Sequence, residues 1–243
     1  MARKRVQTGS SGPGAVWLRE QRPVTRAPAL SPDRIVAAAV GALDRDGVAG
    51  LSMRKLADSF DVHATSLYWH ISSREELLDL ALDAVFGEVA LPQAHFAQWR
   101  DDVALFMREL RRVLLLHPWS AAQAGIRPLL GPNALARFEF VYTALVTAGF
   151  SGADLPAASA AISNFVIGSA AAEAAWRHGS QATDSGAVSA HLRRIGEHYP
   201  TLSAHVLPLG SDWDERFARG TDFLLTGLAV SRDAPHADPP QPR

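Results

Sequence analysis

Helical periodicity, interrupted by proline and glycine, is the feature that most constrains what this chain can fold into. Between residues 31 and 230 the apolar residues recur every three or four positions, as Ile35, Ala39 and Leu43 do, which is the repeat of an amphipathic helix. The segment opens with Ser31 and Pro32, a capping residue followed by a proline at the first helical position. No alternating run of β-branched residues indicates a strand. The sequence therefore predicts an all-α protein.

The predicted helices divide the chain into a small N-terminal three-helix unit, closed by a long fourth helix, and a larger helical body. The first four are predicted from Ser31 to Gly47 or Gly50, from Ser52 to the bend at 60–62, from His63 to His70, and from the Ser73–Glu76 capping box to Pro92. Those of the body are predicted over residues 96–116, 119–124, 132–148, 154–178, 187–198 and 211–230. The corresponding domains span residues 29–89 and 93–230.

The two ends of the chain differ from this helical middle. The first thirty residues hold three prolines and carry a net charge of +5, from Arg3, Lys4, Arg5, Arg19, Arg22 and Arg26 against Glu20. Such a composition buries too little apolar surface to offset its ordering entropy, which predicts a flexible basic arm over residues 1–28. The proline-rich residues 231–243 are predicted to form a disordered tail.

Composition excludes several classes of protein. The chain contains no cysteine, which rules out disulfide bonds, zinc–thiolate sites and a cysteine nucleophile. The basic N-terminus lacks the apolar stretch of a secretory signal, and no segment is expected to reach the roughly 18–20 apolar residues of a membrane span. These features predict a soluble, cytoplasmic protein.

An all-α enzyme is one alternative to a binding protein. His191, His198 and His205 recur every seven residues, which is a spacing worth testing as a metal site. Pro200 interrupts that repeat, and the sequence has neither an HExxH pair nor a nucleophile-elbow motif. We therefore predict no enzymatic activity, with no catalytic residue, no metal site and no cofactor.

Two short helices joined by a tight turn, with longer helices on both sides, predict a helix-turn-helix at about residues 52–71. The second helix must enter a DNA major groove about 12 Å wide, with Leu67 and Val62 turned inward. Hydroxyl groups and rings can contact bases or phosphates, and arginine can bind guanine through two donors. Any short helix pair has this appearance, so a protein-only interaction module is a second alternative. The predicted DNA-facing residues are Arg54, Lys55, Ala64, Thr65, Ser66, Tyr68, Trp69, His70 and Arg74.

A continuous stretch of the sequence is similar to a known DNA-binding domain. Residues 51–82, LSMRKLADSFDVHATSLYWHISSREELLDLAL, resemble that domain of the tetracycline-repressor (TetR) family of bacterial transcription regulators. The Ser-Met-Arg-Lys-Leu-Ala run, the Leu-Tyr-Trp-His core of the second helix and the Arg-Glu-Glu-Leu-Leu start of the next helix carry the likeness. More loosely, residues 116–119, 125–128, 131–133 and 165–168 resemble the regulatory domain of the tetracycline-repressor branch.

The resemblance implies a homodimer that binds a palindromic double-stranded DNA operator and represses transcription until a small-molecule effector binds the body. Activation of transcription by the same fold remains an alternative. Carried over by position, the resemblance implies base or groove contacts for Arg54, Ala64, Thr65, Ser66, Tyr68 and His70, and phosphate contacts for Trp69 and Arg74.

The sequence departs from the family pattern in two places. Asp61 stands where many relatives have glycine in the turn, and aspartate tolerates a left-handed backbone less well than glycine. The tetracycline repressors chelate a drug-bound magnesium through a histidine and a glutamate. Gln123 or Ala124 stands at the histidine position, and Ala172 or, one residue off, Glu173 at the glutamate position. These replacements argue against tetracycline itself as the effector.

Aromatic and polar side chains of the body are predicted to line a pocket for an apolar or aromatic effector, although each aromatic taken alone is also a candidate core residue. The predicted pocket residues are Trp99, Phe106, His117, Trp119, Gln123, Arg127, Phe138, Tyr142, Phe165 and Trp176. The resemblance also implies that helices 154–178 and 211–230 form a four-helix dimer interface. Its predicted residues are Ala161, Phe165, Gly168, Ala172, Trp213, Phe217, Leu224 and Leu228.

The distribution of charge matters more than its sum. The net charge of −1 argues at first against nucleic-acid binding, because such domains are usually basic. Residues 31–86 carry a net charge of −4, so the helix-turn-helix unit does not generally attract DNA. The sequence therefore predicts that the basic arm supplies most of the long-range attraction to DNA.

Overall fold

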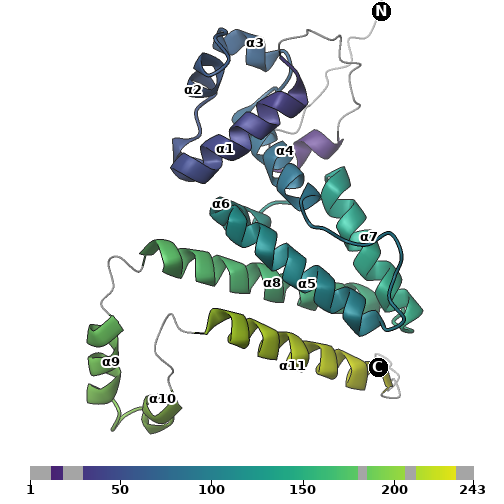
Figure 1. Ribbon diagram of the computed structural model, residues 1–243, viewed down its shortest axis with the longest axis vertical. Coiled ribbons are helices and arrows are strands. Elements are labelled where there is room, and N and C mark those ends of the chain that lie inside the picture. Colours follow the sequence, from purple (N-terminus) through teal and green to yellow (C-terminus); the bar gives the residue numbers. More distant parts are fainter. Residues whose placement is uncertain (1–11, 19–29, 180–184, 206–211, 234–243) are drawn as a thin grey trace, which may run out of the picture.

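The computed structural model describes residues 12–18, 30–179, 185–205 and 212–233, and every regular element in these ranges is a helix (Figure 1). The prediction of an all-α fold is confirmed. After the short 3₁₀ helix η1 (Ala15–Leu18), the helices are α1 (Pro32–Gly50), α2 (Met53–Asp58), α3 (Ala64–Tyr68), α4 (Arg74–Gly87), α5 (Trp99–Leu116), α6 (Pro118–Ala124), α7 (Pro132–Thr147), α8 (Asp154–Gly179), α9 (Ser185–Arg194), α10 (Pro200–His205) and α11 (Trp213–Asp233).

Serine caps start the helices of the N-terminal unit where the sequence predicts them. The Ser31 hydroxyl accepts a hydrogen bond from the Arg34 N–H at 3.3 Å, and the Ser73 hydroxyl accepts one from the Glu76 N–H at 3.1 Å. Each cap satisfies a backbone donor that has no partner within its helix. Gly47 interrupts the end of α1 with a φ of 65°, as the glycine signal predicts.

Helix α4 joins the N-terminal unit to the body. It packs on α1 on one side and on α6 and α7 on the other, and Leu78, Ala81 and Phe86 are fully buried or nearly so. One apolar core runs without interruption from the N-terminal unit through α4 into α5, α7 and α8. Helix α4 therefore contributes to the cores of both units.

Three segments differ from the sequence-based expectation. The helix predicted over 187–198 is α9, which starts at Ser185 and already ends at Arg194, and an additional short helix, α10, begins at Pro200, where proline is favoured as the first helical residue. Helix α11 continues to Asp233, so the first three residues of the predicted tail are helical, and residues 234–243 lie outside the described part. Within the predicted flexible arm, residues 15–18 form η1, which packs on α4, whereas residues 1–11 and 19–29 lie outside the described part.

Helix α8 corrects the expectation that no segment has the length and apolarity of a membrane span. Within Asp154–Arg177, a window of 18 residues has a mean hydropathy of 1.4, so by length and composition alone this helix could cross a membrane. In the fold, however, α8 packs against α5, α6 and α7, and the carboxylate of Glu173 is buried on it in ion pairs with two arginines. These contacts identify α8 as a core helix of the body.

Candidate nucleic-acid interface and regulatory body

The turn between α2 and α3 has the geometry of a helix-turn-helix. The Val62 N–H donates to the Ala57 carbonyl at 3.2 Å, and the Asp61 N–H donates to the Asp58 carbonyl at 3.2 Å. This pair of bonds is a Schellman motif, which places Asp61 at the left-handed position with a φ of 55°. Leu67 is fully buried and fixes the inward face of α3.

Asp61 therefore carries a steric cost that glycine would avoid. We expect Asp61→Gly to raise the free energy of unfolding by about 1 kcal/mol, because glycine adopts a positive φ without strain. The measurement is urea denaturation followed by circular dichroism. The matched control is Asp58→Gly in the last turn of α2, which should lower the free energy of unfolding instead. Loss of stability in Asp61→Gly would show that the aspartate side chain compensates for the backbone strain.

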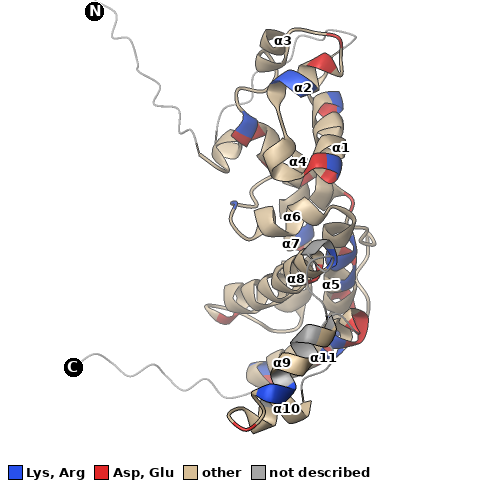
Figure 2. Ribbon diagram, turned by 90° about the vertical axis from the view of Figure 1, so that its left-hand side faces the viewer, with Lys and Arg blue, Asp and Glu red and all other residues tan. Residues whose placement is uncertain are grey.

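The outer face of α2 and α3 presents cations and aromatic rings together. Arg54, Lys55 and Thr65 are exposed, Tyr68 is 50 % exposed and Trp69 is 88 % exposed. Figure 1 places this face at the end of the molecule away from the body, and Figure 2 shows the basic stretch on α2 there. Exposed large aromatic residues indicate an interaction surface. Of the remaining predicted DNA-facing residues on α3 and after it, Ala64, Ser66 and His70 are half-buried.

Arg74 is used inside the N-terminal unit. Its guanidinium donates from Nε to the Leu51 carbonyl at 3.2 Å and from Nη2 to the Val48 carbonyl. These bonds connect the start of α4 to the end of α1, so they favour a structural role over the predicted phosphate contact. The sequence suggests no such role, because the spacing of an arginine on a helix does not identify distant carbonyl groups.

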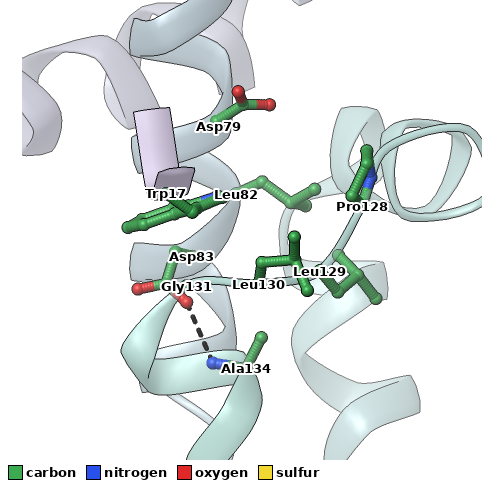
Figure 3. A pocket seen from close by; sticks show the side chains of 9 residues that line it. All are labelled: Trp17, Asp79, Leu82, Asp83, Pro128, Leu129, Leu130, Gly131 and Ala134. Carbon is green, nitrogen blue, oxygen red and sulfur yellow. Dashed lines mark hydrogen bonds between the residues drawn. The ribbon is translucent and has the colours of Figure 1, made fainter. Parts of the chain in front are cut away.

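Three carboxylates on α4, Glu75, Asp79 and Asp83, contact the body and are here called the carboxylate ladder. Glu75, Asp79 and Asp83 follow one another at intervals of four residues and lie on one face of α4. Arg127, which precedes α7, pairs with Glu75 and with Asp79, the latter at 2.7 Å from Nη1 to Oδ1. Asp83 accepts the Ala134 N–H at 2.9 Å and caps the start of α7 (Figure 3). Three acids of the negatively charged N-terminal unit are thus directed at the body.

A second junction connects α1 to the start of α6. The His117 Nδ1 lies 2.9 Å from Oδ1 of Asp44, and its Nε2 lies 3.1 Å from Oε2 of Glu88. The Trp119 indole N–H donates to Asp44 Oδ1 at 2.8 Å. Burial of the His117 ring by itself lowers its pKa, but the hydrogen bonds to Asp44 and Glu88 outweigh burial, so the pKa of His117 is raised above its ordinary value.

The raised pKa of His117 gives the junction a pH dependence. The stabilisation is fully present below the pKa of an unfolded histidine, about 6.5, and is lost as the pH rises through the higher pKa of the folded state. We expect His117→Gln to lower the free energy of unfolding by about 1.5–3 kcal/mol at pH 5.5, the range for hydrogen bonds to charged groups, and by clearly less at pH 8.5.

Urea denaturation at both pH values measures this difference, with His63→Gln, at an exposed position, as the control expected to change stability by less than about 0.5 kcal/mol at either pH. An equal loss for His117→Gln at pH 5.5 and pH 8.5 would contradict a charged His117 in the junction.

The predicted effector-pocket residues lie in several parts of the structure. His117, Trp119, Gln123 and Arg127 lie at the junction of the two units, where the Arg127 Nε donates to the Gln123 side chain at 2.9 Å. The other members lie elsewhere in the body, mostly as core contacts. Phe106 packs on Phe138 with centroids 6.3 Å apart, Trp99 on Phe150 at 5.6 Å and Phe165 on Phe217 at 5.4 Å, while Tyr142 and Trp176 are half-buried.

A different, small cavity lies between α4 and the segment that leads into α7. It has room for about one water molecule, and none of the ten predicted residues lines it (Figure 3). Leu82 and Asp83 line it from α4, and the others come from η1, from the segment before α7 and from α7 itself. The complete lining is Trp17, Asp79, Leu82, Asp83, Pro128, Leu129, Leu130, Gly131 and Ala134.

The predicted dimer residues of α11 mostly face their own body. Phe217 is 6 % exposed, and Leu224 and Leu228 are half-buried against the core. Trp213 is also partly buried. The exposed apolar residues of α11 are Phe223 and Val230, at 75 % and 66 %. Helix α11 therefore has two apolar faces, and the predicted dimer residues lie on the one that packs on the body, so their part in a dimer interface stays a prediction. On α8, Gly168 and Ala172 are exposed as predicted, whereas Ala161 and Phe165 are half-buried.

Glu173 is committed to ion pairs inside the body. Its Oε2 lies 2.6 Å from Nη2 of Arg111, and its Oε1 pairs with Arg177. Arg111 also contacts Asp214 at 2.7 Å and lies over the Phe217 ring at 4.9 Å. The cluster joins α5, α8 and α11, which gives Glu173 a structural role different from that of a metal-chelating glutamate.

A helix-turn-helix with an exposed face of basic and aromatic residues, joined by α4 to a larger helical body, is the architecture of a helix-turn-helix transcription regulator. Residues 35–81 match the family model described as bacterial regulatory proteins, tetR family, and residues 91–232 match the tetracyclin repressor-like C-terminal domain. The chain belongs to the TetR family of bacterial transcription regulators. This is a family of regulators and not of enzymes.

Relatives and solved structures agree with this assignment. A protein from Saccharopolyspora erythraea named HTH-type transcriptional regulator is 54 % identical over 230 residues, covering 95 % of this chain and 98 % of that protein. The HTH-type transcriptional repressor DrrR1 of Streptomyces coeruleorubidus is 31 % identical, covering 84 % of this chain and 78 % of that protein. The structure of Streptomyces coelicolor ActR in complex with actinorhodin matches with a TM-score of 0.77 and 32 % identity, covering 86 % of this chain and 100 % of that one.

Proposed function

We propose that the protein is a cytoplasmic homodimeric repressor that binds a pseudopalindromic operator and releases it when a small molecule binds the body. The observation that carries the proposal is the combined exposure of Tyr68, Trp69, Arg54 and Lys55 at the tip of the N-terminal unit. Hydroxyl and guanidinium donors can bind base edges and phosphates, and a helix of this kind fits the major groove. The repressor name of the DrrR1 relative supports repression over activation.

An exposed apolar surface on α8 and α11 supports dimerisation. Small residues, including Gly168 and Ala172, are exposed along α8, and Phe223, Gly227 and Val230 are exposed along α11. The two helices pack on each other and run side by side in Figure 1. A twofold axis across this surface would bury it in a four-helix interface. The same symmetry would present two recognition helices, which a palindrome with half-sites about 34–36 Å apart requires.

The effector class that we propose is an apolar or aromatic small molecule. The likeness to ActR, which was solved in complex with actinorhodin, supports this class. An effector that favours a body geometry with the wrong spacing of the recognition helices would shift the population away from the DNA-competent dimer. Helix α4 is the lever in this mechanism, because it packs on α1 of the DNA-binding unit and on α6 and α7 of the body.

Binding-site selection from genomic DNA fragments with the purified protein tests the proposed function. The expected result is one enriched pseudopalindrome, bound by two copies of the chain. Actinorhodin then serves as the probe for release, with a rise in the melting temperature and a loss of operator binding as the expected pair of effects. Selection that enriches no sequence would contradict operator recognition, and melting that no aromatic ligand shifts would contradict the effector class.

A further inference from the structure

A short N-terminal segment, residues 12–18, is packed on the lever helix. The Gly14 N–H donates to Asp79 Oδ2 at 2.6 Å in a buried hydrogen bond, and Ala15 is only 6 % exposed. Gly14 has a φ of 79° and approaches Pro128 so closely that an added Cβ would lie 3.0 Å from that ring. Both the backbone conformation and the close contact therefore require glycine at this position.

The same segment also contacts the body. The Trp17 side chain lines the small cavity together with Leu82 of α4 and with Pro128 and Leu130 of the segment before α7 (Figure 3). Trp17 and Gly14 thus contact two elements that belong to different units. The segment thus lies against both α4 and residues 128–130.

Asp79 of α4 contacts both the N-terminal segment and Arg127 of the body. It is 4 % exposed, its Oδ2 accepts the Gly14 N–H, and its Oδ1 lies 2.7 Å from Nη1 of Arg127. Removal of the N-terminal segment would leave one oxygen of this buried carboxylate without that donor, which is unfavourable in a site of low dielectric. The buried carboxylate of Asp79 therefore links the N-terminal segment, α4 and Arg127.

We propose that residues 12–18 act as an intramolecular strap, which fixes the DNA-binding unit on the body by clamping α4 to residues 127–131. The strap sequence, GPGAVWL, carries no charge, so it works by packing and not by attraction to DNA. The predicted arm therefore contains two different parts. The cations Arg3, Lys4 and Arg5 precede the strap, and the residues that contact α4 and the segment before α7 lie within it. A rearrangement of residues 127–131 in the body would be transmitted to the strap directly.

Distance measurement within one chain tests the strap. The sequence has no cysteine, so spin labels on Ala37→Cys in α1 and Val146→Cys in α7, both at exposed positions, report on the two units without further substitutions. Dilution with unlabelled protein restricts the signal to distances within a single chain. The variants are Trp17→Ala, deletion of residues 1–18 and deletion of residues 1–11, with Leu18→Ala, at a 75 % exposed position, as the matched control.

One narrow distance peak is expected for the parent chain, for Leu18→Ala and for the deletion of residues 1–11. A broad distance distribution is expected for Trp17→Ala and for the deletion of residues 1–18. Circular dichroism and thermal melting show which variants remain folded. If the deletion of residues 1–18 does not fold, the distance distribution of Trp17→Ala tests the strap by itself. An unchanged narrow peak in folded Trp17→Ala would overturn the strap. The measurement uses neither DNA nor effector, so failure of the proposed function would leave its outcome unaffected.

Discussion

Replacing Phe223 and Val230 with glutamate should convert the protein into a monomer. Both side chains are largely exposed in the single chain, so the substitutions should leave its fold intact. In the proposed twofold interface each residue occurs twice, and each buried glutamate would lie in an apolar contact without a partner of opposite charge. Central apolar residues of interfaces contribute about 2 kcal/mol or more each, so the dissociation constant of the dimer should rise at least about 100-fold.

Sedimentation velocity over a range of protein concentrations measures this shift. Leu135→Glu on α7, at a position that is 49 % exposed, is the control because it places a glutamate at an exposed apolar position outside α8 and α11. The monomeric variant should also lose most of its affinity for a palindromic operator, since one recognition helix reads only one half-site. A dimer of unchanged stability would show that the exposed face of α11 is not the interface.

Removing the side chains of the reading face should produce the other large effect. We expect Tyr68→Ala and Arg54→Ala each to weaken operator binding by about 1–3 kcal/mol, which corresponds to a loss of about 5- to 150-fold in affinity. A residue that contacts a base should also relax the preference at one operator position, whereas a phosphate contact should weaken binding to all sequences alike and reduce the salt dependence. Fluorescence anisotropy on operator variants at several salt concentrations distinguishes these two roles.

The control for the arginine is Arg45→Ala on α1, which removes the same charge from an exposed position next to Asp44 at the junction with the body. This variant should bind the operator with nearly the parent affinity. If Arg54→Ala and Tyr68→Ala also bind like the parent chain, the outer face of α2 and α3 is not the reading face. Equal losses in Arg45→Ala and Arg54→Ala would indicate a general effect of charge in place of a specific contact.

Local signals made the DNA-binding unit predictable. Ser31, Ser52 and Ser73 start three helices because a serine hydroxyl satisfies a nearby backbone N–H, which is a property of a few neighbouring residues. The left-handed turn at Asp61 and the buried position of Leu67 also follow from short-range spacing. Such features depend little on the rest of the chain, so sequence patterns identify them well.

The body was less predictable because its decisive contacts join distant residues. Phe217 and Phe223 lie six positions apart on α11, and both are large and apolar, yet one packs on Phe165 and the other is 75 % exposed. Nothing in the spacing distinguishes an internal face from an external one. The same limit applies to the prediction of the effector pocket. Aromatic residues such as Phe106 and Phe138 occur both in pocket linings and in cores, so their residue type does not distinguish the two.

The strap was missed for a compositional reason. Proline, glycine and serine near Gly14 predict a flexible segment, and the three cations at the start of the chain strengthen that interpretation. The contacts that order the segment lie more than sixty residues away, as the Gly14–Asp79 hydrogen bond shows. A buried carboxylate on a distant helix is a partner that composition does not reveal.

The carboxylate ladder on α4 has a consequence for exchanging parts between relatives. Glu75, Asp79 and Asp83 have their partners in the segment that holds Arg127 and Asn133, far along the chain. A chimera that places residues 30–89 on the body of another regulator would bring three inward-facing acids into contact with a surface not built to receive them. Residues 127–134 and the strap would have to be transplanted together with the DNA-binding unit. The functional module for recombination is therefore set by contacts across the junction, and it is larger than the helix-turn-helix domain that the sequence delimits.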